Sequence, residues 1–387
     1  MLPLRSRCTI LVARGEIAAT LGATGVTDIT TAKAIRRGTR TGYYGSIDAI
    51  RFLSAFAVLL HHAVGRPAFL LLGGWTWAAD IAGSLWFGRS AVMVFFLISG
   101  FCVHGPNLRS DDFDVVRFLT RRYVRLLIPF AVILLIAGAV GVSYHPYHGW
   151  ITWSLICEFA YYTSYPVLRI LWQRFGWPVT ILASYVAGYA VLAVSWIEAD
   201  VENTALMIAT DVLSCLPVWL LGCWLVEVVS TGRKLVFDHL AVWRCVIVLA
   251  SLTIGLLHYR GVVGLELTGP IYGAVAVPWL WAEISHDRNY PVVTKWGQWS
   301  YSLYLVHPAA FFGSRPLLVA LHVPGPLLTP VGILVALVCA YLFYLAVERP
   351  SHRLARALSA RRPDLGADHA QASLAKGAAA ANPVRFE

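Results

Sequence analysis

The stretch Ser46–Val64, SIDAIRFLSAFAVLLHHAV, is apolar enough to cross a bilayer, yet it carries charged and titratable side chains. On a helix, Asp48, Arg51 and His62 share one face, because steps of three and four residues connect them. Arg51 and His62 are separated by about three turns, or roughly 16 Å of rise. Charge at the bilayer centre costs on the order of 3 kcal/mol on insertion scales, so such residues usually face a protein interior or an aqueous cavity. The stretch predicts a membrane-spanning helix with a cation near one end and an imidazole farther along; the alternative for His62 is a hydrogen bond to a neighbouring helix.

The composition is typical of a polytopic membrane protein and excludes an ordinary soluble domain. Of the 387 residues, 58% are hydrophobic and 13% are charged. The net charge of +10 is attributed to cytoplasmic loops, so we expect no nucleic-acid partner. Six of the seven cysteines fall in apolar runs and no two form a CxxC pair, so we expect neither disulfides nor a metal site.

Ten apolar runs of spanning length predict an all-α polytopic transmembrane helical bundle. Their approximate ranges are 46–64, 84–105, 123–143, 150–172, 177–196, 205–228, 241–258, 262–283, 299–321 and 327–347. Pro166 lies in the fourth run, and Pro308 and Pro316 lie in the ninth, so we expect kinks or broken helices there.

Basic residues are concentrated in the loops on one side of the predicted membrane. Arginine or lysine follows the second, fourth, sixth and eighth runs, whereas the alternate loops carry Arg66, Arg260 and little else. The positive-inside rule then places both termini in the cytoplasm. The expected organisation is a poorly ordered cytoplasmic tail at 1–43, an integral membrane domain at 44–352 and a disordered cytoplasmic tail at 353–387.

A pair of arginines lies at the predicted inner end of the third span, in the stretch RFLTRRYVRLLIP. Arg122 and Arg125 are three residues apart and therefore share one helix face. Guanidinium groups bind phosphate bidentately and do not titrate. The pair is suited to clamp a phosphorylated cytosolic ligand; the alternative is an anchor or a contact with lipid phosphates.

Polar side chains also lie inside the fourth and ninth apolar runs. Glu158 is within WITWSLICEFAYY, where an ionised carboxylate must be paired or protonated. We expect it to pair with Arg51 or to orient the imidazole of His62, and a purely structural buried pair is the alternative. In the ninth run, WGQWSYSLYLVHP, spacings of three and four place a set of polar residues on one face: Ser300, Tyr301, Tyr304 and His307.

Together these stretches resemble the acyltransferase-3 family of bacterial integral membrane acyltransferases. Arg51 and His62 match the hallmark of that family's opening helix, an arginine followed by ten residues and a histidine. The stretches VFFLISGF, RRYVR, WSLICEFAYYTSYP, WSYSLYLVHP and VERP are similar to its further motifs. The resemblance runs in order from about 46 to 352 and covers most of the chain.

The resemblance implies an enzyme of the bacterial inner (cytoplasmic) membrane that moves an acyl group, expected to be acetyl, from cytosolic acyl-CoA to a hydroxyl of a cell-surface or lipid-linked carbohydrate. The catalytic residues it implies are His62 and Glu158, with His62 acting as a general base or as a transient acyl carrier. The residues expected to bind the CoA donor are Arg51, Arg122 and Arg125. The residues expected to position the substrate are Tyr301, Tyr304 and His307.

Other functions remain compatible with the same sequence. A transporter or a lipid or glycan flippase would share the spans and the buried charges but needs no CoA site. A catalytically silent relative would keep the fold alone, and a secondary metabolite such as a macrolide is an alternative acceptor. Membrane lipids are expected partners in every case, and the sequence leaves the oligomeric state open.

Overall fold

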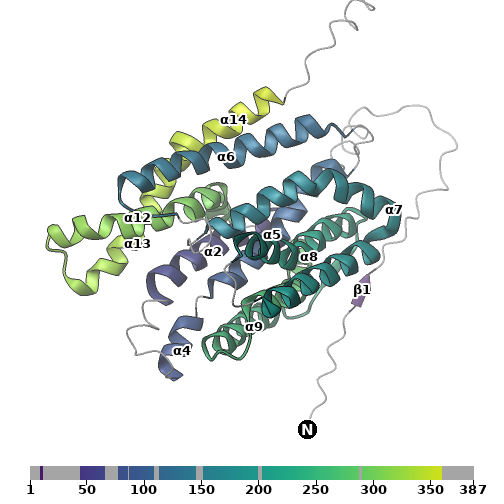
Figure 1. Cartoon of the computed structure of the whole chain (residues 1–387), viewed down its shortest axis with the longest axis horizontal. Helices are drawn as coiled ribbons and strands as arrows, with labels where there is room; N and C mark the ends of the chain where they lie inside the picture. The colour runs from purple at the N-terminus through teal and green to yellow at the C-terminus, as the bar shows by residue number, and fades with distance from the viewer. Residues whose placement is uncertain are drawn as a thin grey trace, which may run out of the picture.

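The computed structural model shows a helical bundle (Figure 1) and describes residues 9–11, 44–65, 77–85, 87–108, 113–144, 151–198, 203–286 and 290–359. Most of the two predicted tails, 1–43 and 353–387, lies outside the described residues. The described strands are β1 (Thr9–Leu11) and β2 (Lys234–Val236), which pair antiparallel. Everything else with regular structure is helical, so the predicted helical fold class is confirmed.

The helices follow the predicted apolar runs closely. The first helix, α2 (Gly45–Leu60), continues directly into a π-helical turn, η1 (His61–Gly65). The helices of the middle of the chain are α4 (Trp77–Ser84), α5 (Gly88–His104), η2 (Gly105–Asn107), α6 (Val115–Ala139), α7 (Thr152–Ile197), α8 (Thr204–Ser230) and α9 (Leu240–Tyr259). Those of the last third are α10 (Leu265–His286), α11 (Pro291–Trp296), η3 (Gly297–Trp299), α12 (Ser300–Ala320), α13 (Gly325–Phe343), η4 (Tyr344–Glu348) and α14 (Arg349–Leu358).

Seven helices of the described chain are long and apolar enough to cross a membrane, which makes this a multi-pass membrane protein. One of them, α7, has 46 residues and leaves the helical conformation at Gly176, where φ is 79°. It therefore contains both of the predicted runs 150–172 and 177–196, and its break lies after Pro166. The predicted runs 262–283 and 299–321 coincide with α10 and α12, which are not among the seven. The count of ten spans and the cytoplasmic placement of the termini stay predictions.

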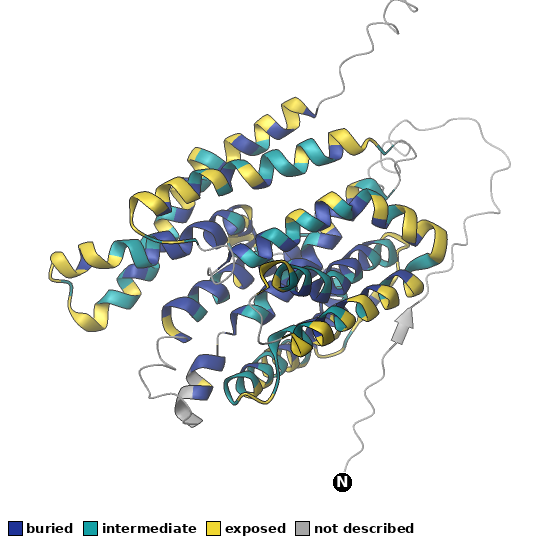
Figure 2. Cartoon of the chain, in the orientation of Figure 1, coloured by how far each residue is buried: buried dark blue, intermediate teal, exposed yellow. Residues whose placement is uncertain are grey.

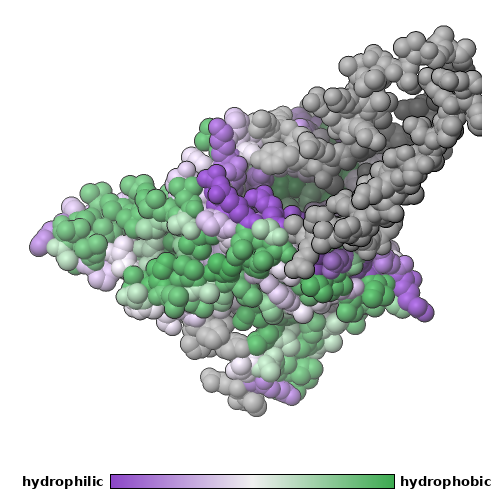
Figure 3. Space-filling view, turned by 90° about the horizontal axis from the view of Figure 1, so that it is seen from above, coloured by the Kyte–Doolittle hydropathy of each residue, from purple (hydrophilic) through white to green (hydrophobic). Residues whose placement is uncertain are grey.

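Helices α2, α5 and α8 form the centre of the bundle, and α6, α7 and α13 lie farther out (Figure 1). Figure 2 shows the buried residues gathered on the central helices, with exposed residues along the outer faces. Many exposed residues are large and apolar, among them Leu135, Ile170 and Leu182. Figure 3 shows the same property as extensive apolar surface with hydrophilic side chains gathered in patches. Such a surface is suited to contact lipid tails.

Two glycines bring α5 and α8 into backbone contact. A Cβ atom on Gly100 would lie 2.0 Å from the carbonyl oxygen of Trp219, and one on Gly222 would lie 2.0 Å from that of Leu97. Small residues at such positions let transmembrane helices approach closely. The close approach at Gly100 and Gly222 therefore packs α5 directly against α8.

Gly100→Ala is expected to destabilise the protein by about 1–3 kcal/mol, because the new methyl group meets backbone that no rotamer change can move. The measurement is thermal unfolding of the purified protein in detergent. Gly138→Ala is the matched control, since a Cβ atom there meets nothing within 4 Å. Equal melting temperatures for the two variants would contradict the close approach of α5 and α8.

Candidate active site

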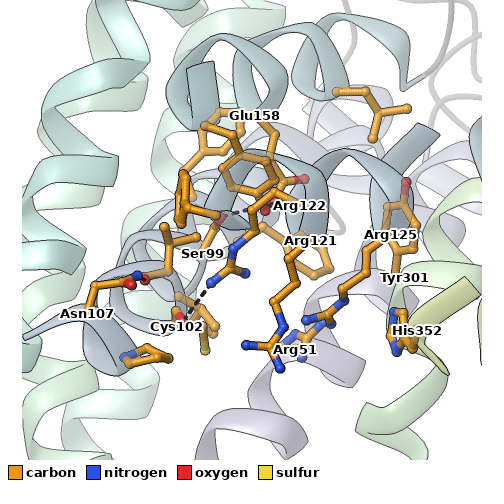
Figure 4. A pocket seen from close by; sticks show the side chains of 18 of the residues that line it. Arg51, Ser99, Cys102, Asn107, Arg121, Arg122, Arg125, Glu158, Tyr301 and His352 are labelled. Atoms are coloured by element: carbon orange, nitrogen blue, oxygen red, sulfur yellow. Dashed lines mark hydrogen bonds between the residues drawn. The ribbon is translucent and has the colours of Figure 1, made fainter. Parts of the chain in front are cut away.

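A cavity of about 710 Å³ lies between α2, α5, α6, α7, α12 and α14. We call it the arginine cavity, because six arginines line it: Arg51, Arg117, Arg121, Arg122, Arg125 and Arg356. Figure 4 shows Arg51, Arg121, Arg122 and Arg125 extending into the same space. Among the described residues, no carboxylate forms an ion pair with any arginine that α6 contributes. The cavity therefore has an excess of positive charge available to an anionic ligand.

Helix α6 supplies most of this charge because of its spacing. Asp114 caps the helix by accepting a hydrogen bond from the backbone N–H of Arg117, 2.9 Å away. Arg117, Arg121 and Arg125 then follow at intervals of four residues and share one face. Arg117 and Arg121 are exposed, whereas Arg125 is only partly exposed. The positive face thus runs from solvent into the cavity.

Arg122 is held in place by α5 and by aromatic rings. One of its terminal nitrogens donates to the carbonyl oxygen of Cys102 at 3.4 Å, and its guanidinium lies 5.6 Å from the rings of both Phe118 and Tyr162. Its Nε atom is buried, and no described residue accepts a hydrogen bond from it. A buried donor in a positive cavity is a position at which an anionic ligand would complete the hydrogen bonding.

Glu158 lies on the wall of the same cavity but does not contact the histidine. Its Oε1 accepts hydrogen bonds from Ser99 Oγ at 2.9 Å and from the hydroxyl of Tyr162. The predicted contact of Glu158 with His62 is therefore wrong, and the ion pair of Arg51 is with Asp48 at 3.6 Å. The physical reason is position along the helices: Glu158 bonds to Ser99, in the last third of α5, whereas His62 lies in η1, beyond the end of α2.

Glu348 is a second buried carboxylate at this site, and the sequence analysis did not identify it as a candidate. It ends the π-helical turn η4 and is 2% exposed. Its Oε2 accepts hydrogen bonds from the backbone N–H of Ser302, at 3.1 Å, and from the Ser302 hydroxyl. His352, one turn later, lies 3.6 Å from its other oxygen and lines the cavity. The sequence signal for Glu348 is the stretch VERP, in which it directly follows the last apolar run.

His62 and His307 form a buried pair. His62 Nδ1 lies 2.9 Å from His307 Nε2, and the two rings are nearly parallel, with 12° between their planes. The Nδ1 atom of His307 lies 3.1 Å from the carbonyl oxygen of Leu303 and 2.9 Å from that of Tyr304. Carbonyl oxygens only accept, so Nδ1 of His307 carries a proton and, in the neutral ring, its Nε2 accepts. The shared hydrogen is then donated by His62 Nδ1, which assigns the unprotonated nitrogen of a neutral His62 to Nε2.

Pro308 explains why the ring of His307 can bond to the backbone. A proline has no N–H, so it leaves the carbonyl oxygen four residues earlier, that of Tyr304, without its helical donor. His307 supplies the missing donor from its side chain. Next along the helix, the hydroxyl of Tyr144 donates to Leu305 O at 2.7 Å and accepts from the Ala309 N–H at 3.3 Å. Burial raises the pKa of this phenol, so it stays protonated and able to donate.

Tyr304 connects the arginine cavity to the histidine pair. It lines the cavity, and its hydroxyl hydrogen-bonds to Ser154 Oγ at 2.6 Å. Phe95 packs edge-on against its ring, with the centroids 5.5 Å apart. His307 is one turn farther along α12, about 4.5 Å of rise, and its ring centroid is 6.2 Å from that of Tyr304. Tyr304 therefore forms part of the cavity wall and lies next to His307 on the other side.

The structure thus brings most of the predicted residues to one place. The predicted residues that line the arginine cavity are Arg51, Arg122, Arg125, Glu158, Tyr301 and Tyr304. The hydroxyl of Tyr301 donates to the carbonyl oxygen of Leu126 at 3.0 Å and so ties α12 to α6. His62 and His307 lie just beyond the wall, as a pair with each other. Among the described residues, no group of three or more histidine, cysteine or carboxylate side chains is arranged to hold a metal ion.

Comparisons with known proteins bear on the family of the chain. The model of a family described as an acyltransferase domain matches residues 44–345. Nodulation protein 10 of Rhizobium leguminosarum bv. viciae is 27% identical over 214 residues, which cover 42% of this chain and 53% of that protein. The chain therefore aligns with about half the length of this relative, and no solved structure matches it. Since the family match spans well over half of the sequence, from the first helix to the last apolar one, the chain belongs to the acyltransferase-3 family.

Proposed function

We propose that this protein transfers an acyl group, acetyl in the first instance, from cytosolic acyl-CoA to a hydroxyl of a cell-surface or lipid-linked carbohydrate. The observation that carries the proposal is the arginine cavity, which ends one helical turn from the His62–His307 pair. Family membership supports acyl transfer. The identity of the donor and the acceptor is argued from the chemistry of the cavity.

The charge of the cavity favours a polyphosphorylated donor. Arg122 and Arg125 would bind the phosphate groups, because guanidinium forks match phosphate oxygens in geometry and charge. Arg51 lies deeper on α2 and would neutralise charge nearer the thioester. A volume of about 710 Å³ is within the range of cavities that enclose small molecules and cofactors.

The deep end of the cavity favours a short acyl group. The side chains there are bulky and packed against each other, since Phe95 contacts the Tyr304 ring and Tyr304 bonds to Ser154. A long acyl chain would have to displace these contacts. An acetyl group has only two carbons and would fit without displacing these contacts.

In the proposed reaction, Nε2 of neutral His62 takes the proton of the acceptor hydroxyl as its oxygen forms a bond to the thioester carbonyl carbon. The tetrahedral intermediate then collapses, the C–S bond breaks, and CoA leaves as a thiolate that takes up the proton held by His62 Nε2. His307 stabilises the imidazolium of His62 by accepting the hydrogen bond from its Nδ1. In the alternative order, His62 Nε2 itself attacks the carbonyl, the C–S bond breaks and CoA leaves as a thiolate. The acceptor hydroxyl then takes the acyl group from Nε2, and its proton neutralises the thiolate.

The expected result of a direct test is that purified protein in detergent binds acetyl-CoA with labelled acetyl and slowly hydrolyses it or transfers the label. A transporter or flippase has no need of a CoA site and would show neither binding nor hydrolysis. For the acceptor, a deletion strain is expected to lose O-acetyl groups from surface carbohydrate and to regain them when the gene is restored. Unchanged carbohydrate acetylation would exclude this acceptor and direct the search to secondary metabolites.

A further inference from the structure

A second cavity, of about 270 Å³, lies beside the arginine cavity and shares Asn107 with it. We call it the tryptophan cavity, after its most prominent side chains. The residues of its wall used below are Asn107, Arg169, Trp172, Gln173, Trp177 and Glu227. They come from the end of η2, from both sides of the break in α7 and from the end of α8. These ends lie on the same side of the bundle as the arginines of α6, which is the predicted cytoplasmic side.

The break at Gly176 creates the aromatic wall. Gly176 has a φ of 79°, a conformation that favours glycine, and the chain turns there between two helical segments of α7. The turn brings Trp172 and Trp177 together with ring centroids 4.8 Å apart and only 10° between the ring planes. His104 packs edge-on against Trp172, with the centroids 4.9 Å apart. The wall is therefore flat, rigid and aromatic.

The polar groups of the tryptophan cavity are also fixed. Glu227 accepts from Trp177 Nε1 at 2.6 Å through one oxygen and from His104 Nε2 at 2.9 Å through the other. Each carboxylate oxygen has a second lone pair with which to accept from a ligand. The side chain of Gln173 is exposed at the rim and offers an amide with both a donor and an acceptor.

We propose that the tryptophan cavity binds the adenine ring of the acyl-CoA donor, an inference that rests on the function proposed above. A base can stack on an aromatic wall, and base–aromatic stacking contributes about 1–3 kcal/mol to the free energy of binding. Glutamine amides pair bidentately with the N6 and N7 atoms of adenine, and Glu227 would accept the other hydrogen of the N6 amino group. With adenine in the tryptophan cavity, the phosphates of the donor would pass Asn107 and reach the arginine cavity. The thioester would then point toward Tyr304.

The composition of this cavity distinguishes adenine from an organic cation such as a lipid ammonium headgroup. Tryptophan and a carboxylate would attract either ligand. Arg169, however, lines the same cavity, donates to the Asn107 carbonyl oxygen at 2.9 Å and places a permanent cation beside the ligand. A second cation would be repelled, whereas a neutral aromatic base would not.

The test compares two donors on the full-length protein. Acetyl-CoA carries the adenine nucleotide, and acetyl-4′-phosphopantetheine lacks it. Trp177→Ala is expected to weaken acetyl-CoA binding about tenfold, in line with the loss of stacking, and to leave binding of acetyl-4′-phosphopantetheine unchanged. Trp196→Ala, which removes an exposed tryptophan at the opposite end of α7, is the matched control and is expected to change neither.

A second measurement avoids any change in folding. Gln173 is exposed, so Gln173→Ala leaves the packing intact. Wild-type protein is expected to bind acetyl-CoA several-fold more tightly than its 1,N6-etheno derivative, in which the N1 and N6 edge of adenine is blocked. Gln173→Ala is expected to reduce this preference.

The outcomes separate the two proposals. If wild-type protein does not bind acetyl-CoA, the proposed function fails. If it binds acetyl-CoA but Trp177→Ala affects both donors equally, and the etheno derivative binds as well as acetyl-CoA, the adenine site is overturned while the proposed function stands. Competition by a choline analogue, abolished in Trp177→Ala, would instead assign the tryptophan cavity to an organic cation and also overturn the adenine site.

Discussion

Replacing His62 with alanine is expected to lower the rate of acyl transfer by about 10²–10⁴-fold, the usual contribution of a general base, while acetyl-CoA binding is retained. The reason is the position of the imidazole. His62 lies beyond the wall of the arginine cavity, so it does not hold the phosphates, and its Nδ1 is committed to His307. In the neutral ring, Nε2 is the nitrogen that carries no proton and can take one. The measurement is kcat and donor affinity on the same purified variant.

His61→Ala is the matched control for this experiment. His61 is the adjacent residue in the same π-helical turn. Its ring centroid lies 5.2 Å from that of His62 and 6.2 Å from that of Phe87, but His61 does not take part in the hydrogen bond between His62 and His307. We expect it to keep most of the activity. Persistent carbohydrate acylation by an abundant, correctly inserted His62→Ala variant would reject the proposed role.

His307 is expected to behave as a positioning residue. His307→Ala removes the acceptor that fixes the tautomer of His62, so we expect a smaller fall in kcat than for His62→Ala and an unchanged donor KM. Because His307 is buried, the alanine variant could also be less stable, and a lower rate could then reflect unfolded protein. His307→Gln, whose amide oxygen can accept from His62 Nδ1, is therefore expected to restore part of the activity if positioning is the role.

Removing the arginine pair is expected to have the second large effect. A hydrogen bond to a charged group contributes about 1.5–3 kcal/mol, so each of Arg122→Ala and Arg125→Ala is expected to weaken donor binding by about ten- to a hundredfold. The buried Nε of Arg122, for which no described residue accepts, is the structural basis for expecting the larger loss there. Isothermal titration with acetyl-CoA is the measurement, repeated at rising salt to weaken the electrostatic attraction.

Substitution by lysine separates charge from geometry at the same positions. Lysine keeps the positive charge but lacks the planar fork, so Arg122→Lys is expected to bind more weakly than wild type and more tightly than Arg122→Ala. Arg353→Ala removes an exposed arginine of α14 that does not line the cavity, and it serves as the control. If Arg122→Ala and Arg125→Ala bind acetyl-CoA as tightly as wild type, these residues do not bind the donor, and their role is that of membrane anchors.

Much of the fold was predictable because a bilayer restricts the choices. Apolar runs of about 20 residues must be helices when they cross lipid, and each predicted run overlaps a helix, with two of the runs in α7. The break of α7 at Gly176 falls between the predicted runs 150–172 and 177–196, whereas α7 stays helical at Pro166, where a kink or break was expected. A proline can remain within a transmembrane helix when neighbouring groups satisfy the freed carbonyl, and the pairing of His307 with Tyr304 shows this at Pro308.

The sequence by itself determined the helical membrane class, the family and the set of polar residues within apolar runs, because hydrophobicity and short spacings are local properties. It did not determine which of those polar residues meet. Glu158 was expected to pair with Arg51 or to orient His62, but it accepts hydrogen bonds from Ser99 and Tyr162. His62 pairs with His307, 245 residues away in the chain. Such contacts depend on the depth and rotation of each helix against its neighbours. Close packing sets both, as at Gly100 and Gly222, and it is a property of the assembled bundle that no single stretch encodes.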